Sequence, residues 1–109
     1  MEKIGLFFGS FNPVHKGHIN IAKYVLSEQK LNKVLFILSP LNPFKIESKN
    51  ILLEVNHRYE ILKLATKKYK NMIPSDIEFG MKKPNYTFDT IAKLENIYPK
   101  KKFYLIMGS

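Results

Sequence analysis

Short apolar runs alternate along this chain with segments in which apolar residues recur at helical spacing. Lys3–Phe8 and Lys33–Leu38 are nearly continuous apolar runs, as strands covered on both faces are. A third run, Lys102–Met107, has the same character, and Ser75–Phe79 is a weaker candidate. The pattern therefore predicts four strands.

Three intervening segments have helical periodicity. They are His18 to about Lys30, Glu54–Lys68, and Thr87–Ile97, where Thr87 is a predicted N-cap and Asp89 in the first turn suits the helix dipole. The predicted inward residues are Ile19, Ala22, Val25 and Leu26 in the first helix, Val55, Tyr59, Ile61, Leu62 and Ala65 in the second, and Phe88, Ile91 and Leu94 in the third.

The predicted order is β-α-β-α-β-α-β, which indicates an α/β fold with a Rossmann-like open parallel sheet. We expect residues 1–109 to form one domain, with loops at 39–50 and 80–85. Ligands of such sheets bind beyond the carboxyl ends of the strands, where Gly9, Ser39, Gly80 and Gly108 are expected. The last strand lacks its covering helix, so we expect the sheet to be incomplete at its C-terminal side.

Composition narrows the class of protein. The chain has no cysteine, which excludes disulfides and thiolate zinc sites, and no apolar run approaches a membrane span, so a cytoplasmic protein is expected. The formal net charge is +9, but 17 of the 18 basic residues are lysines and Arg58 is the one arginine. Because nucleic-acid surfaces favour arginine, a solvated lysine-rich surface is the preferred interpretation, and neither nucleic acid nor membrane is an expected partner.

The most informative segment is Gly9–His18 (GSFNPVHKGH), between the first strand and the first helix. Gly9 permits a sharp exit from the strand, and Gly17 removes bulk beside the helix start, where unpaired N–H groups and the dipole favour phosphate. His15 and His18, three residues apart, are expected to point into the same volume and donate hydrogen bonds to charge growing on a phosphoryl group. A metal site that also uses His57 is the alternative, but it lacks a carboxylate or cysteine partner at a familiar spacing.

This segment resembles the signature of the HxGH nucleotidyltransferase superfamily. Three further segments are similar to bacterial nicotinate mononucleotide adenylyltransferases: the proline-rich loop from Ser39 to Lys45, the pair His57-Arg58, and Pro84–Thr90 (PNYTFDT), where Asn85 replaces the usual serine. The resemblance implies direct in-line transfer of an adenylyl group from ATP to nicotinate mononucleotide, with Mg²⁺ held mainly by the triphosphate.

The resemblance also implies roles for single residues. His15 and His18 would be catalytic, and Tyr86 and Thr87 would bind the pyridine nucleotide. Residues that would bind ATP or its phosphates are Gly9, Ser10, Phe11, His15, Gly17, His18, Lys45 and Gly108. Thr87 as a cap, Tyr86 as packing and Lys45 as a solvated lysine remain alternatives, and Arg58 is expected to secure a loop or a carboxylate.

Two other functions stay open. Phosphopantetheine adenylyltransferases and cytidylyltransferases share the Gly-x-Phe-x-Pro opening, although the former usually have threonine at the position of His15. A non-catalytic domain that binds nucleotide or nucleic acid is the other alternative. The chain ends before the family's later aspartate, aromatic and Ser/Thr-x-x-Arg motifs, so we expect the 109 residues alone to be inactive, and self-association through the exposed sheet is possible.

Overall fold

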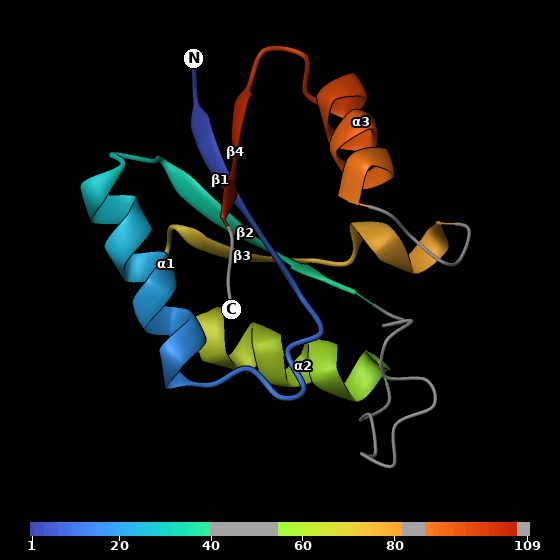
Figure 1. Ribbon diagram of the computed structural model, residues 1–109. Helices are drawn as coiled ribbons and strands as arrows, with labels where there is room; N and C mark the ends of the chain where they lie inside the picture. The colour runs from blue at the N-terminus through green and yellow to red at the C-terminus, as the bar shows by residue number, and fades with distance from the viewer. Residues whose placement is uncertain (40–54, 82–86, 107–109) are drawn as a thin grey trace.

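A parallel four-stranded sheet forms the centre of the computed structural model, which describes residues 1–39, 55–81 and 87–106 (Figure 1). The strands lie in the order β3-β2-β1-β4, and every neighbouring pair is parallel. Their bounds are β1 (Lys3–Gly9), β2 (Lys33–Leu38), β3 (Met72–Ser75) and β4 (Lys102–Ile106). The helices are α1 (Lys16–Glu28), α2 (Val55–Thr66) and α3 (Thr87–Ile97), with a short 3₁₀ helix η1 (Ile77–Gly80). This confirms the predicted α/β, Rossmann-like sheet.

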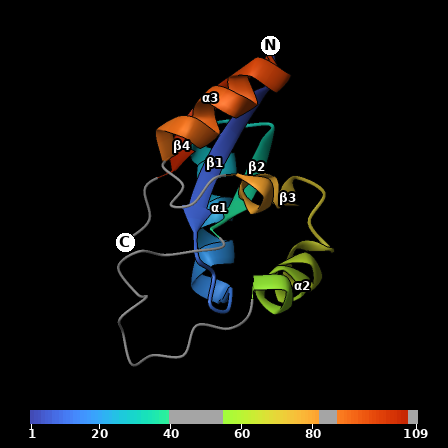
Figure 2. The ribbon, with the colours of Figure 1, turned by 90° about the vertical axis from the view of Figure 1, so that its right-hand side faces the viewer.

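Helices cover both faces of the sheet: α1 and α2 lie on one face and α3 on the other (Figures 1 and 2). Successive residues of the central strand β1 point to opposite faces. Phe7 belongs to the core under α1 and α2, whereas Leu6 packs with Leu94 of α3. Burial on both sides explains why β1 reads as an uninterrupted apolar run.

The third strand lies earlier than the sequence predicts. Instead of Ser75–Phe79, the residues Met72–Ser75 pair with β2, and Ile77–Gly80 form η1. Pro74 argues against a strand in the sheet interior because it lacks an N–H, but β3 is an edge strand, where proline is tolerated. Gly80 therefore ends η1, and its predicted place at a strand end is wrong.

Two helix predictions also need correction. Helix α1 begins at Lys16 rather than at His18, because His15 acts as the N-cap. In α3 the bounds agree, but Phe88 is 78% exposed, not inward, while Thr90 and Leu94 are buried. Thr90 occupies the inward face since its hydroxyl has a buried hydrogen-bond acceptor, Glu78, beneath the helix.

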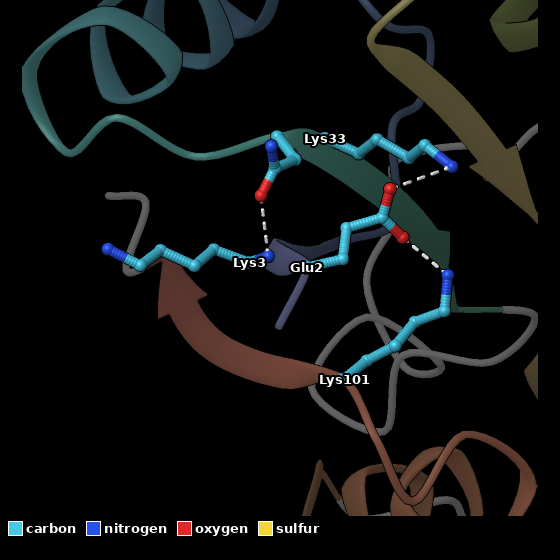
Figure 3. A network of polar contacts seen from close by, with 5 residues as sticks. Glu2, Lys3, Lys33 and Lys101 are labelled. Atoms are coloured by element: carbon cyan, nitrogen blue, oxygen red, sulfur yellow. Dashed lines mark hydrogen bonds and ion pairs between the residues drawn. The ribbon is translucent and has the colours of Figure 1, made fainter.

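The amino edge of the sheet is held by charged and polar side chains (Figure 3). Glu2 forms ion pairs with Lys33, at 3.2 Å, and with Lys101. The backbone N–H of Lys3 donates to the side-chain oxygen of Asn32 at 2.7 Å. These contacts connect the starts of β1, β2 and β4, and they lie at the opposite edge from the candidate site.

Candidate functional site

The loop that leaves β1 is anchored by Phe11. Its φ of 42° lies in the left-handed region, which costs a non-glycine residue about 1–2 kcal/mol. Burial offsets this cost, because the ring is 3% exposed and its centroid lies 5.5 Å from those of both Phe7 and Phe36. Any contact of Phe11 with a ligand would therefore come from its backbone. Gly9 leaves room for the ring, since an added Cβ would lie 3.1 Å from Phe11 Cζ.

His15 and His18 form a reciprocal cap on α1. The Nδ1 atom of His15 accepts a hydrogen bond from the N–H of Gly17 at 3.0 Å, and Nδ1 of His18 accepts from the N–H of His15 at 3.0 Å. The two ring centroids lie 3.9 Å apart with an angle of 31° between the planes. The structure thus brings the two predicted catalytic side chains together at the start of the helix.

These hydrogen bonds determine which ring nitrogen carries the proton. A neutral imidazole has one donor and one acceptor nitrogen, so each ring that accepts through Nδ1 carries its proton on Nε2. Burial, and the neighbouring His15 to a smaller extent, lower the pKa of His18, which favours its neutral form. The pair therefore offers two Nε2–H groups, and N–H donors of this kind bind the oxygens of a phosphoryl group.

The backbone N–H groups at this helix start are largely used within the cap. Those of His15 and Gly17 donate to the two imidazoles, while those of His18 and Ile19 donate to the carbonyl of His15 at 3.0 and 3.3 Å. The expectation of unpaired amides here is therefore wrong for these four groups. In this arrangement an anion would draw mainly on the side-chain donors and on the helix dipole.

Gly17 is required by the His15 ring. An added Cβ at Gly17 would lie 2.8 Å from Cε1 and 3.0 Å from Nδ1 of His15. The absence of a side chain therefore allows the imidazole to fold back over the first turn and accept the Gly17 N–H. A role of Gly17 in phosphate binding stays a prediction.

Arg58 of α2 fastens the site to the sheet. Its side chain is 1% exposed, and Nη1 donates to the carbonyl oxygens of Ser10 at 2.7 Å and Ser39 at 2.9 Å. Ser10 follows β1 and Ser39 follows β2, so one guanidinium connects the segments that leave the two strands. The prediction that Arg58 secures a loop is confirmed.

The remaining predicted residues are less fully placed. Lys45, Tyr86 and Gly108 lie outside the described residues, and their roles stay predictions. Thr87 lies within α3 as its first residue rather than before it as the predicted N-cap. It is exposed, on the opposite face of the sheet from α1. The carbonyl of Ser10 serves as an acceptor for Arg58, and a role of Ser10 in binding phosphate stays a prediction.

The sequence reasoning missed a buried polar pair on the α3 face. Glu78 of η1 is 3% exposed, and its carboxylate accepts a hydrogen bond from the Thr90 hydroxyl at 2.5 Å. Burial raises the pKa of Glu78, and the bond from Thr90 partly counteracts this effect. The pair ties η1 to the first turn of α3, three residues after Thr87. The sequence held one signal for this pair: Glu78 is an acidic residue shortly after β3, at the edge of the sheet where ligands bind.

The donor set suits an anion more than a metal ion. Within the described ranges, no three side chains of His, Asp or Glu gather as metal ligands, and this includes His57. The histidine pair presents N–H groups, which bind phosphate oxygens. That Mg²⁺ is held mainly by a bound triphosphate stays a prediction. None of the described helices is long and apolar enough to cross a membrane.

A parallel sheet with paired imidazoles at its carboxyl edge is the arrangement that the resemblance to nucleotidyltransferases implies. A sequence model of the cytidylyltransferase-like family matches residues 6–109, so the chain belongs to that family.

Relatives with high sequence similarity carry a narrower name. The chain is 44% identical over 106 residues to a probable nicotinate-nucleotide adenylyltransferase of Flavobacterium psychrophilum, covering 97% of this chain and 54% of that protein. It is 45% identical over 107 residues to a protein of the same name from Carboxydothermus hydrogenoformans, covering 98% and 52%. The chain thus spans about half the length of the curated relatives it matches.

Solved structures share the fold. A nicotinic acid mononucleotide adenylyltransferase of Plasmodium falciparum, complexed with NaAD, superposes with a TM-score of 0.77 at 15% identity, over 96% of this chain and 51% of that one. A putative nicotinate-nucleotide adenylyltransferase of Vibrio parahaemolyticus gives a TM-score of 0.77 at 24% identity, over 100% and 59%. At these identities the similarity establishes the fold alone.

Proposed function

We propose that the complete protein is a nicotinate-nucleotide adenylyltransferase, which joins ATP and nicotinate mononucleotide into deamido-NAD and diphosphate. The observation that carries the proposal is the histidine pair at the start of α1, whose ring centroids lie 3.9 Å apart and whose Nδ1 atoms are both used in the cap. The acceptor is inferred from the names of the relatives, because their sequences match this one over 97% and 98% of the chain.

The reaction is a direct transfer. A phosphate oxygen of nicotinate mononucleotide attacks the α-phosphorus of ATP, a new P–O bond forms, and the bond to the bridging oxygen of the β-phosphate breaks. Diphosphate leaves with the bonding electrons, and no covalent enzyme intermediate forms. Because the transition state spreads charge over the phosphoryl oxygens, positioned N–H donors are the chemistry that the reaction needs.

Each site residue has a proposed part in this reaction. His15 and His18 donate through Nε2 to oxygens of the transferred group, and Arg58 holds the loop that carries them. Lys45 and Gly108 would bind the phosphates of ATP, and Tyr86 and Thr87 the pyridine nucleotide. Mg²⁺, held mainly by the triphosphate, would neutralise part of its charge. A cytoplasmic location and self-association stay predictions.

A different nucleotide or acceptor is the second candidate, since the family takes its description from cytidylyltransferases. The alternatives differ in substrates but share the transfer step. A panel of ATP and CTP against nicotinate mononucleotide, nicotinamide mononucleotide and phosphopantetheine separates them, because only the correct pair releases diphosphate at a rate that saturates with both substrates.

The decisive experiment uses the protein at the full length of its curated relatives, of which this chain covers about half. Diphosphate release from ATP should require nicotinate mononucleotide and should fall to background in the variant His18→Ala. If His18→Ala retained most of its kcat, the assigned role of the pair would be wrong. If diphosphate release required a different acceptor, the assignment of nicotinate mononucleotide would be wrong, but the proposed transfer step would still stand.

A further inference from the structure

A basic groove lies between α1 and the turn that follows α2. The cavity has a volume of about 340 Å³. Its polar lining consists of His15, Lys16, Asn20, Lys23, Lys68 and Tyr69. The groove therefore begins at the outer side of the histidine pair and extends along α1 towards the C-terminal end of α2.

Two ammonium groups converge on one aromatic ring in this groove. The Nζ atoms of Lys23 and Lys68 lie 4.9 and 5.4 Å from the centroid of the Tyr69 ring. The hydrogen bond with Lys23 lowers the pKa of Tyr69, which indicates a local positive potential. Among the described residues, no carboxylate forms an ion pair with Lys16, Lys23 or Lys68.

This arrangement differs from an ordinary solvated lysine surface. What sets these lysines apart is that Lys16, Lys23 and Lys68 line one cavity; three others are paired with carboxylates, Lys33 and Lys101 with Glu2 and Lys63 with Glu60. In the groove, three cations surround one cavity without a described acidic partner, and their mutual repulsion is reduced when an anion binds between them.

The chemistry of the lining selects a compact, highly charged anion. Ammonium groups are point charges suited to phosphate oxygens, and the Asn20 amide and the Tyr69 hydroxyl add neutral donors. The ring of Tyr69 already carries the two ammonium groups, so it suits an aromatic ligand less well. A volume near 340 Å³ lies at the low end for small-molecule sites and exceeds the needs of one phosphate group.

We propose that this groove binds a diphosphate group, either free or as part of a nucleotide, beside the histidine pair. His15 borders both places, so an occupant would place negative charge next to the transfer site. The proposal rests on the groove itself and holds whichever acceptor the reaction uses.

The test is a calorimetric titration of the complete protein with sodium diphosphate, and separately with ATP, at low ionic strength. The groove variant Lys23→Gln/Lys68→Gln removes two charges, one from a helix and one from a turn. Its control, Lys93→Gln/Lys100→Gln, removes two exposed charges from α3 and from the turn that follows it. Thermal unfolding should be similar for the two variants because all four lysines are exposed.

Diphosphate affinity should fall about tenfold in the groove variant and less than about twofold in the control. A fall confined to ATP would support the site with a nucleotide tail as occupant. Equal losses in the two variants would show that only net charge matters and would overturn the proposal. The same comparison in a His18→Ala background separates the groove from the histidine pair, since a loss that disappeared there would place the anion on the histidines alone.

Discussion

The imidazoles of His15 and His18 are joined through the backbone of His15. Its N–H donates to Nδ1 of His18, and its own ring accepts the N–H of Gly17 two residues later. One set of contacts therefore caps the helix and orients two Nε2–H groups. A variant that keeps the cap hydrogen bond but lacks the Nε2–H donor separates the stability of the helix from the proposed chemistry.

His18→Asn separates the cap from the reaction. The asparagine side-chain oxygen lies near the position of Nδ1 and can accept the His15 N–H, but no donor replaces Nε2. We expect stability within about 0.5 kcal/mol of the parent and a loss of about 100-fold to 1,000-fold in kcat. His18→Ala should lose the activity and also about 1 kcal/mol of stability. Diphosphate release and thermal unfolding measure the two effects, and an active His18→Asn enzyme would contradict the donor role.

The pH dependence of stability should report on His18. Burial lowers its folded pKa below the ordinary value of 6.5, so the unfolded chain binds more protons between the two values. This contribution to stability is complete above about pH 6.5 and is lost as the pH falls through the lowered folded value. His18→Asn should remove that slope from the Tm profile. Nitrogen chemical shifts should also show the proton on Nε2; a proton on Nδ1 would refute the assigned tautomer.

Arg58 can be tested by a substitution that preserves its charge. The guanidinium Nη1 donates to two carbonyls, those of Ser10 and Ser39, in a buried position that the shorter reach and single nitrogen of lysine cannot match. Arg58→Lys should destabilise the protein by about 1–3 kcal/mol in denaturant unfolding. In the complete enzyme kcat should also fall, because the loop that carries the histidines loses its anchor. Unchanged stability and kcat would mean that the two carbonyls do not need Arg58.

Thr90→Val tests the buried pair on the α3 face. Valine has nearly the same shape but leaves the carboxylate of Glu78 without its hydrogen-bond donor, which should cost about 1–3 kcal/mol at neutral pH.

Because burial raises the folded pKa of Glu78, its contribution to stability is complete below about pH 4.5 and is lost as the pH rises through the raised value. Glu78→Gln should flatten that decline, and denaturant unfolding at several pH values measures it. An unchanged profile would show that Glu78 does not titrate in this range.

The sequence predicts the features that depend on periodicity and rare residues. Such signals predict the strands that coincide with apolar runs. They also predict the face of α1 that buries Ile19 and Ala22, and the anchoring role of Arg58. It does not predict the start of α1, because histidine is outside the usual group of N-cap residues. It also misses the Glu78–Thr90 pair, because a polar contact in the core depends on how α3 is rotated over the sheet, and hydrophobic periodicity carries no information about it.

The amino edge provides a stability measurement that leaves the site untouched. Hydrogen bonds with Lys101 and then Lys33 lower the pKa of Glu2 (Figure 3). A carboxylate with a lowered folded pKa contributes stability above about pH 4.5, and the contribution is lost as the pH falls through the lowered value. Glu2→Gln should therefore lower the Tm at pH 7 more than Glu95→Gln, which removes the same charge from an exposed position of α3. Because these partners are accessible to solvent, the difference between the two variants should shrink as salt is added. Equal Tm values for the two variants at low salt would show that the ion pairs at this edge do not stabilise the sheet.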